Sequence, residues 1–471
     1  MGGAGAAARM TRVTHVAIIG GGPGGYEAAL VAAQLGADVT LVDSDGLGGS
    51  AVLTDCVPSK TLIATSEVMN DLELSPGLGI HRASGEDGEA VVDLGEVNTR
   101  VLDLARAQSS DIEKRLARDG VRVLHGRGRL DGPQHVVATT EAGEETLEAD
   151  AVLVATGAAP RTLDTAVPDG ERILTWEQVY ALDERPEHLV VVGSGVTGAE
   201  FASAYLALGI EVTLVSSRDR VLPGEDADAA EVLEMVFIRR GMNVLSKTRM
   251  QSVVREGDAV RVTLVDGREV VGSHCLLALG SVPNTGDMGL EDAEVHLDDG
   301  GFVRVDRVSR TTARGVYAAG DCTGVLMLAS VAAMQGRIAM AHALGDAVAP
   351  LDLKKVSSNV FTAPEIATVG WSQRALDAGE IDAEVVMMPL ATNPRAKMQG
   401  ISDGFVKLLA RRGTGTIVGG VVVAPRASEL VHALAIAVGE NLTADQLAHA
   451  FTVYPSISGS IAEAARRLHR A

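Results

Sequence analysis

The sequence predicts an α/β protein of more than one domain. Its 471 residues exceed the usual size of one domain, and 46% apolar with 22% charged residues is ordinary for a globular chain. The more specific observation is an internal repeat. Residues 16–25 (VAIIGGGPGG) and 189–198 (LVVVGSGVTG) each join an apolar, β-branched run to the pattern GxGxxG. Each copy continues into a helix-like segment, a glycine and a second apolar run, which predicts two βαβ units.

The three glycines of each copy have different physical tasks. They are Gly20, Gly22 and Gly25 in the first copy, and Gly193, Gly195 and Gly198 in the second. One permits a tight turn, one lets a diphosphate approach the backbone, and one lets the helix pack on the strand. The diphosphate is then held at a helix N-terminus, where free N–H groups and the helix dipole favour anions. We therefore predict two Rossmann-like, doubly wound domains that each bind a dinucleotide.

The residue that ends the second strand differs between the copies. Asp43 and Ser216 each lie 23 residues after the first glycine of their copy. A carboxylate at this position binds the ribose 2′-hydroxyl and repels a 2′-phosphate, so Asp43 favours FAD or NAD. Ser216 imposes no such repulsion and is followed by Arg218 and Arg220, and arginine suits phosphate recognition. We predict NADPH as the second nucleotide, with NADH also accepted; two solvated loop arginines are the competing interpretation.

Two further segments identify a family. They are Thr311–Asp321 (TTARGVYAAGD) and Gly48–Lys60 (GGSAVLTDCVPSK). With the repeat, they resemble the flavoprotein disulfide reductases, the family of dihydrolipoamide dehydrogenase and glutathione reductase, over residues 12–468. The resemblance implies a homodimer whose last segment enters the partner's active site. The implied ranges are a disordered tail (1–11), a split FAD-binding domain (12–157 and 286–349), an NAD(P)-binding domain (158–285) and an α+β dimerisation domain (350–471).

The resemblance also assigns cofactor contacts. Asp321 would accept a hydrogen bond from a ribityl hydroxyl of FAD, and the Gly128 backbone would contact the adenine. The start of a helix, formed by Leu328, Ala329 and Ser330, would lie near the flavin ring. The remaining predicted cofactor-binding residues are Gly20, Gly22, Pro23, Gly25, Asp43, Ser44, Gly49, Ser50, Lys60, Thr156, Gly157, Gly193, Gly195, Val196, Thr197, Gly198, Ser216, Arg218 and Gly280.

The residues of dithiol chemistry depart from the family pattern. Of the two family cysteines only Cys56 is present, and Ala51 stands in place of the other. The family's histidine base and the glutamate that orients it are replaced by Tyr454 and Gly459. A disulfide needs two sulfurs, and tyrosine, whose pKa in water is about 10, is a poor base at neutral pH. The sequence therefore predicts that disulfide reduction, including lipoamide dehydrogenase activity, is lost.

The residues of electron input match the family pattern. Lys60 corresponds to the lysine near flavin N5, where it would stabilise negative charge on reduced flavin, and Glu200 to its ion-pair partner. A plain structural salt bridge is the alternative. Without a disulfide, electrons must pass directly to a docked acceptor, and quinones need no thiol chemistry. We predict an FAD-dependent NAD(P)H:quinone oxidoreductase in which Tyr454 of the partner lines the acceptor site.

Cys56 keeps a second function open. At a helix start, where a thiolate is favoured, it could cycle through sulfenic acid in a peroxide- or oxygen-reducing NAD(P)H flavoprotein. It could instead modulate the flavin or be an inert packing residue. A degenerate structural subunit is a third hypothesis, which the complete glycine patterns and the residues Lys60 and Glu200 oppose.

Composition excludes several classes of protein. The net charge of −21 without a basic block argues against a nucleic-acid partner. No apolar run approaches the roughly 20 residues that span a bilayer, and no secretory signal is evident. Three distant cysteines indicate a reducing compartment and exclude a zinc ribbon, and we expect Cys275 and Cys322 in the core. We predict a cytoplasmic protein that binds no metal.

Overall fold

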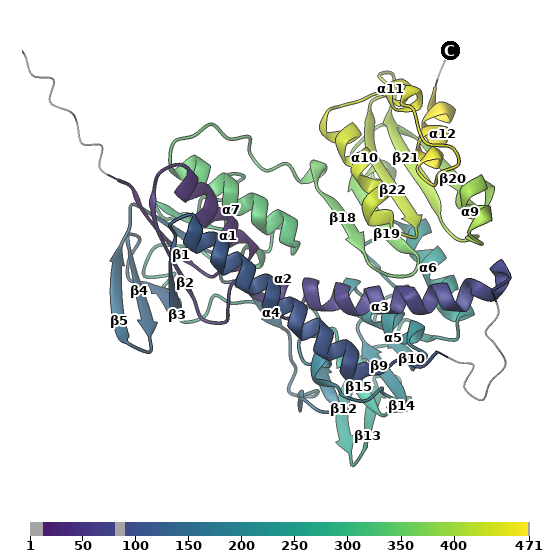
Figure 1. Cartoon of the computed structure of the whole chain (residues 1–471), viewed down its shortest axis with the longest axis horizontal. Coiled ribbons are helices and arrows are strands. Elements are labelled where there is room, and N and C mark those ends of the chain that lie inside the picture. Colours follow the sequence, from purple (N-terminus) through teal and green to yellow (C-terminus); the bar gives the residue numbers. More distant parts are fainter. Residues whose placement is uncertain (1–12, 81–89, 470–471) are drawn as a thin grey trace, which may run out of the picture. The chain divides into compact units, whose positions relative to one another are not determined.

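The computed structural model describes residues 13–80 and 90–469 (Figure 1). The predicted disordered tail (1–11) therefore lies outside the described residues. The chain forms two compact units: the first contains residues up to Cys56, Ala105–Ala159 and Val282–Leu351, and the second contains Val57–Leu104, Pro160–Ser281 and the residues from Asp352 on. Residues 57–104, predicted within the FAD-binding range, thus belong to the second unit. The predicted domain limits stay a prediction.

The first unit is built on a seven-stranded sheet of order β17-β6-β1-β2-β3-β4-β5. Its first five strands are parallel, and β4 and β5 extend it as an antiparallel edge. Helices α1 and α7 pack against each other (Figure 1). The first predicted βαβ unit is confirmed as β1-α1-β2. The elements are β1 (His15–Ile19), α1 (Pro23–Gln34), β2 (Asp38–Asp43), α2 (Gly49–Leu53), β3 (Arg122–Leu130), β4 (His135–Thr140), β5 (Gly143–Glu148), β6 (Ala151–Val154), β17 (Val316–Ala318) and α7 (Ala329–Ala343).

The second unit contains a parallel sheet of order β11-β10-β9-β15-β8 and a three-stranded antiparallel sheet, β12-β13-β14. The second predicted βαβ unit is confirmed as β9-α5-β10. The elements are α3 (Cys56–Leu74), β8 (Ile173–Thr175), β9 (His188–Val192), α5 (Val196–Ala207), β10 (Glu211–Val215), α6 (Ala227–Arg239), β11 (Asn243–Leu245), β12 (Met250–Glu256), β13 (Ala259–Leu264), β14 (Glu269–Gly272) and β15 (His274–Leu277). Helix α4 (Leu94–Arg118) continues from this unit into the first, and β7 (Ala158–Pro160) and β16 (Ser281–Pro283) form a two-stranded sheet.

The C-terminal part of the second unit is an antiparallel sheet of order β18-β19-β22-β21-β20 that packs against α10 and α12. The elements are β18 (Ser357–Val360), β19 (Glu365–Gly370), α8 (Gln373–Asp377), β20 (Ala383–Pro389), α9 (Pro394–Met398), β21 (Phe405–Arg411), β22 (Ile417–Ala424), α10 (Ala427–Gly439), α11 (Ala444–His449) and α12 (Gly459–Leu468). An antiparallel sheet with helices packed against it agrees with the predicted α+β class.

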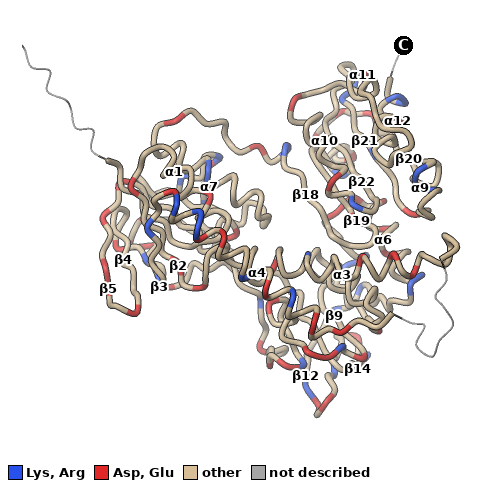
Figure 2. Tube along the Cα trace, viewed as in Figure 1, with Lys and Arg blue, Asp and Glu red and all other residues tan. Residues whose placement is uncertain are grey.

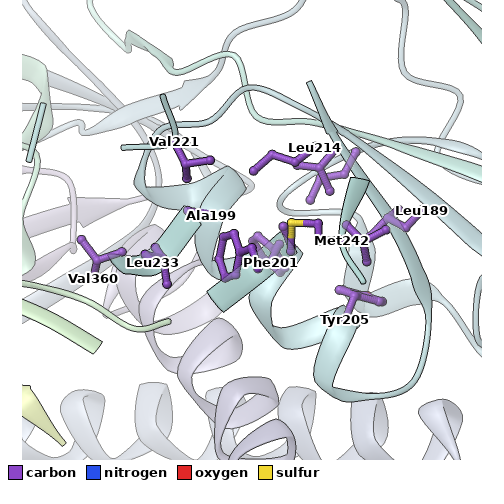
Figure 3. Packing of buried hydrophobic residues seen from close by; sticks show 14 of the residues in the cluster. Leu189, Ala199, Phe201, Tyr205, Leu214, Val221, Leu233, Met242 and Val360 are labelled. Carbon is purple, nitrogen blue, oxygen red and sulfur yellow. The ribbon is translucent and has the colours of Figure 1, made fainter. Parts of the chain in front are cut away.

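One buried cluster joins the two parts of the second unit. Phe201 and Tyr205 of α5 pack with Leu233 of α6 and with Val360 of β18 (Figure 3). Acidic and basic residues are distributed along the trace of both units (Figure 2). Within the described ranges, no helix has the length and apolar character needed to cross a membrane.

Candidate functional site

Of the three glycines of the GxGxxG pattern between β1 and α1, two cannot carry a side chain and one can. A Cβ on Gly20, whose φ is +103°, would lie 2.2 Å from the Ala155 carbonyl oxygen, and a Cβ on Gly25 would lie 1.8 Å from the Gly20 carbonyl oxygen. A Cβ on Gly22 would meet only the Gly49 Cα, at 4.0 Å. Gly22 therefore leaves open space at the start of α1, as a bound diphosphate requires.

The turn between β9 and α5 repeats this arrangement. A Cβ on Gly193 would lie 2.1 Å from the Ala278 carbonyl oxygen, and a Cβ on Gly198 would lie 1.9 Å from the Gly193 carbonyl oxygen. A Cβ on Gly195 would meet nothing within 4 Å. The two turns thus fit the diphosphates of two dinucleotides. Pro23, Val196 and Thr197, also predicted contacts, lie in the first turns of α1 and α5.

Alanine at Gly195 and alanine at Gly193 should have different effects, the first on NADPH binding and the second on stability. Gly195 has φ −72°, which any residue adopts, so Gly195→Ala should keep a wild-type melting temperature but bind NADPH about tenfold or more weakly, because the methyl group occupies the diphosphate position. Gly193→Ala should instead lower the melting temperature, because its φ is +114° and its Cβ meets backbone. Thermal unfolding and NADPH titration measure both effects; equal melting temperatures for the two variants would contradict the assignment.

Asp43, at the end of β2, organises the turn beside the first glycine pattern. Its Oδ2 accepts from the Gly21 N–H (2.6 Å), and its Oδ1 accepts from the N–H groups of Asp45 (3.1 Å) and Gly46 (2.6 Å). The side chain is buried, yet each carboxylate oxygen can accept a second bond. Asp43 therefore fixes the loop and keeps the capacity to accept a further hydrogen bond.

An open cavity of about 580 Å³ lies beside this loop. It is lined by Ser44, by His125 to Arg127 of β3 and by the β4–β5 turn. Gly128 follows directly in β3, where a Cβ would lie 3.0 Å from the Ile19 side chain. The structure thus brings the predicted contact Ser44 beside the strand that carries Gly128.

Asp321 follows Gly320 at the end of β17. Burial, and secondly the Asp55 carboxylate, raise the pKa of Asp321 to about 6. The turn around Asp321 is held by Gln335, whose Oε1 accepts from the Gly320 N–H (2.8 Å) and whose Nε2 donates to the Thr323 hydroxyl (3.3 Å). Gln335, which no sequence motif indicates, is buried in the otherwise apolar face of α7. Leu328, Ala329 and Ser330 form the N-terminal turn of that helix.

The predicted cofactor contacts Thr156 and Gly157 are held by hydrogen bonds with Asn284. Thr156 donates from Oγ1 to the Asn284 carbonyl (2.7 Å), and Asn284 donates from Nδ2 to the Thr156 carbonyl (3.0 Å). The Asn284 N–H also donates to the Gly157 carbonyl (3.0 Å), and Gly280 accepts from the Arg161 N–H (2.9 Å).

Ser216 has a local structural task. Its hydroxyl is fully buried and lies 2.7 Å from the Ser194 hydroxyl, and it accepts from the Arg218 N–H (3.1 Å). Ser194, which stands inside the second GxGxxG pattern, was missed by sequence analysis. Ser216 therefore holds the loop that carries Arg218 rather than offering a free hydroxyl.

The predicted pair of Lys60 and Glu200 is present. Lys60 Nζ lies 2.7 Å from Glu200 Oε2, and the Glu200 side chain is only 5% exposed. Glu200 Oε1 accepts from the Phe361 N–H (2.8 Å), and the Phe361 ring centroid lies 4.9 Å from Lys60 Nζ. Phe361, which sequence analysis missed, thus helps to orient both charged groups.

The three cysteines are free thiols in different surroundings. Cys56 begins α3 and is half-buried, one helical turn before Lys60. Cys275 and Cys322 are fully buried, as expected. Burial raises the pKa of Cys275 strongly and that of Cys322 to about 11, which makes both poor nucleophiles. Gly49, Ser50 and Ala51 lie in the preceding short helix α2.

The segment that carries Tyr454 is exposed in the single chain. Tyr454 is 83% exposed, and Phe451 and Val453 are exposed as well. Asn393, another residue that sequence analysis missed, donates from Nδ2 to the Ser456 carbonyl (3.0 Å) and anchors this segment. Exposed aromatic and apolar residues in a fixed segment are typical of a surface that another chain covers.

Comparison with known proteins identifies the family. The model for pyridine nucleotide-disulphide oxidoreductases matches residues 14–336, and the dimerisation-domain model of the same family matches residues 356–465. The NAD(P)H dehydrogenase (quinone) of Mycobacterium tuberculosis is 55% identical over 97% of this chain and 94% of its own. Dihydrolipoyl dehydrogenase 2 of Haloarcula marismortui is 32% identical over 97% of both chains.

Solved structures agree with this assignment. The crystal structure of LpdA from Mycobacterium tuberculosis covers 97% of this chain and 100% of its own, with a TM-score of 0.92 and 54% identity. The flavoprotein disulfide reductase RclA of Escherichia coli shares the fold, with a TM-score of 0.85 and 22% identity. The chain belongs to the pyridine nucleotide-disulphide oxidoreductase family and is a flavoprotein oxidoreductase that uses FAD and NAD(P)H.

Proposed function

We propose that this flavoprotein passes electrons from NAD(P)H to a quinone, without a redox disulfide and without lipoamide dehydrogenase activity. The observation that carries the proposal is the combination of two complete dinucleotide turns and the Lys60–Glu200 pair with Ala51 in place of a cysteine. The name of the 55% identical relative, NAD(P)H dehydrogenase (quinone), supports it.

In this proposal the residues of the chain bind, orient and stabilise. FAD, when bound, supplies a carrier that accepts hydride and releases two electrons. Gly22 and Gly195 leave room for the diphosphates, Lys60 stabilises developing negative charge, and Glu200 holds Lys60 in place. Tyr454 lines the acceptor site of the partner in a cytoplasmic homodimer, which agrees with its exposure in the single chain.

The raised pKa of Asp321 predicts pH-dependent retention of FAD. Its proposed role is to accept from a ribityl hydroxyl, and a carboxylate accepts more strongly than a carboxylic acid. FAD affinity should therefore fall as the pH drops through about 6. Asp321→Asn should bind FAD more weakly at neutral pH, with no such dependence. The fluorescence of released FAD measures both; an unchanged pH profile in the variant would rule out this role.

One comparative assay tests the function. Anaerobic oxidation of NADPH and NADH is measured with menadione, lipoamide, glutathione disulfide and hydrogen peroxide as acceptors. We expect rapid turnover with menadione and background rates with both disulfides. Substantial turnover of either disulfide would overturn the proposal.

Cys56 provides an internal control. Menadione reduction by Cys56→Ser should match that of the wild-type protein, because a quinone needs no thiol. A loss of menadione turnover in this variant, with FAD still bound, would point instead to an obligatory thiol cycle.

A further inference from the structure

The ends of β10 and β11 bring a lysine against the loop that carries Arg218. Ser216 donates its N–H to the Leu245 carbonyl (2.8 Å), and its carbonyl accepts from the Thr248 N–H (3.0 Å). Between these two bonds, the Lys247 N–H donates to the Arg218 carbonyl (2.7 Å). The backbone of Lys247 is therefore fixed beside Ser216. Ser216 occupies the position at which other dinucleotide-binding domains carry a ribose-binding carboxylate.

Lys247 has an unusual backbone conformation. Its φ is +58°, in the left-handed region that non-glycine residues seldom adopt. Such conformations persist only where the surroundings hold them, and they cluster at binding sites. Here the bonds to Arg218 and around Ser216 hold the turn.

The charges of this turn are not neutralised by the protein. Among the described residues, no carboxylate pairs with Lys247 or Arg218, although the chain carries a net charge of −21. The acidic residues near this turn have basic partners of their own. Asp219 pairs with Arg220, and Asp266, which accepts from the Thr248 hydroxyl (3.0 Å), pairs with Arg268. Cations without a carboxylate partner, at the carboxyl edge of a dinucleotide-binding sheet, are the residue type that recognises a phosphate dianion.

We propose that Lys247 and Arg218 together bind the 2′-phosphate of NADPH, so that Lys247 determines nucleotide specificity. The proposal rests on the proposed use of NADPH as electron donor. Ser216 contributes in two ways. It carries no carboxylate that would repel the 2′-phosphate, and its hydroxyl holds the loop that carries Arg218. Both long side chains are rooted in one hydrogen-bonded turn, so a single phosphate can engage both.

Binding of 2′,5′-ADP and of 5′-AMP to the FAD-loaded protein, measured by titration calorimetry, tests this site without any acceptor. The wild-type protein should bind 2′,5′-ADP more tightly than 5′-AMP. Lys247→Asn, which keeps a residue tolerant of positive φ, should bind 2′,5′-ADP about tenfold more weakly and 5′-AMP unchanged. Lys247→Arg should restore most of the affinity. Lys114→Ala removes an equal charge from an exposed site and should change neither affinity.

Two outcomes would overturn the inference. One is wild-type protein that binds both probes equally, and the other is Lys247→Asn that keeps its affinity for 2′,5′-ADP. Menadione turnover is measured separately. Protein that distinguishes the probes but does not reduce menadione would refute the proposed acceptor and leave the phosphate site standing.

Discussion

Lys407→Ala is expected to lower the free energy of unfolding by about 3 kcal/mol, because it leaves a buried carboxylate without its cation. The Lys407 side chain in β21 is 2% exposed, and its Nζ lies 2.8 Å from both carboxylate oxygens of Asp226, whose side chain is 3% exposed. Lys407 also donates to the carboxylate of Asp228, which is exposed. Asp226 also caps α6 by accepting from the N–H groups of Asp228 and Ala229. Urea unfolding followed by circular dichroism measures the loss.

The double variant Lys407→Met/Asp226→Asn removes the ion pair but keeps a side chain that can cap the N-terminus of α6. Asparagine is as good an N-cap as aspartate, and methionine fills the buried volume of the lysine, so most of the lost stability should return. Arg122→Ala breaks the exposed pair with Glu145 and should cost much less. A Lys407→Ala protein as stable as the Arg122→Ala protein would show that the buried pair contributes little.

The sequence predicts best those parts of the fold that depend on residues adjacent in the chain. The two βαβ units follow from apolar runs, glycine turns and helix-like segments that are adjacent in the chain, and the structure confirms both. The pair of Lys60 and Glu200 was predicted through the family resemblance, and it is present. Roles of these residues toward a cofactor stay predictions.

The features that sequence could not supply depend on partners far along the chain. Nothing around Lys407 in GFVKLLARR reveals that its partner, Asp226, lies 181 residues away. The Phe361 backbone N–H donates to Glu200, 161 residues earlier in the chain. Every residue except proline has such a donor, so the sequence does not indicate which one is used. Lys247 belongs to no recognisable motif, and only the pairing of two strand ends places it against Arg218.

The largest functional effect is expected at Lys60. Lys60→Met should slow the anaerobic reduction of bound FAD by NADPH about 100-fold, because an oriented charge at a reacting centre contributes far more than a solvated one. The Glu200 carboxylate, buried and held by the Phe361 N–H, fixes that orientation. Rapid-mixing absorbance of the flavin measures the rate, and the FAD content of each variant is measured beforehand.

Glu200→Gln distinguishes charge from position. Glutamine can still accept from the Phe361 N–H but no longer holds Lys60 by charge, so flavin reduction should slow less than in Lys60→Met. Lys60→Arg keeps the charge in a different shape and should retain part of the rate. A purely structural salt bridge would instead lower the melting temperature in Lys60→Met and leave its reduction rate at the wild-type value. The rate and the melting temperature, measured on the same three proteins, therefore decide whether the pair serves electron transfer or only the fold.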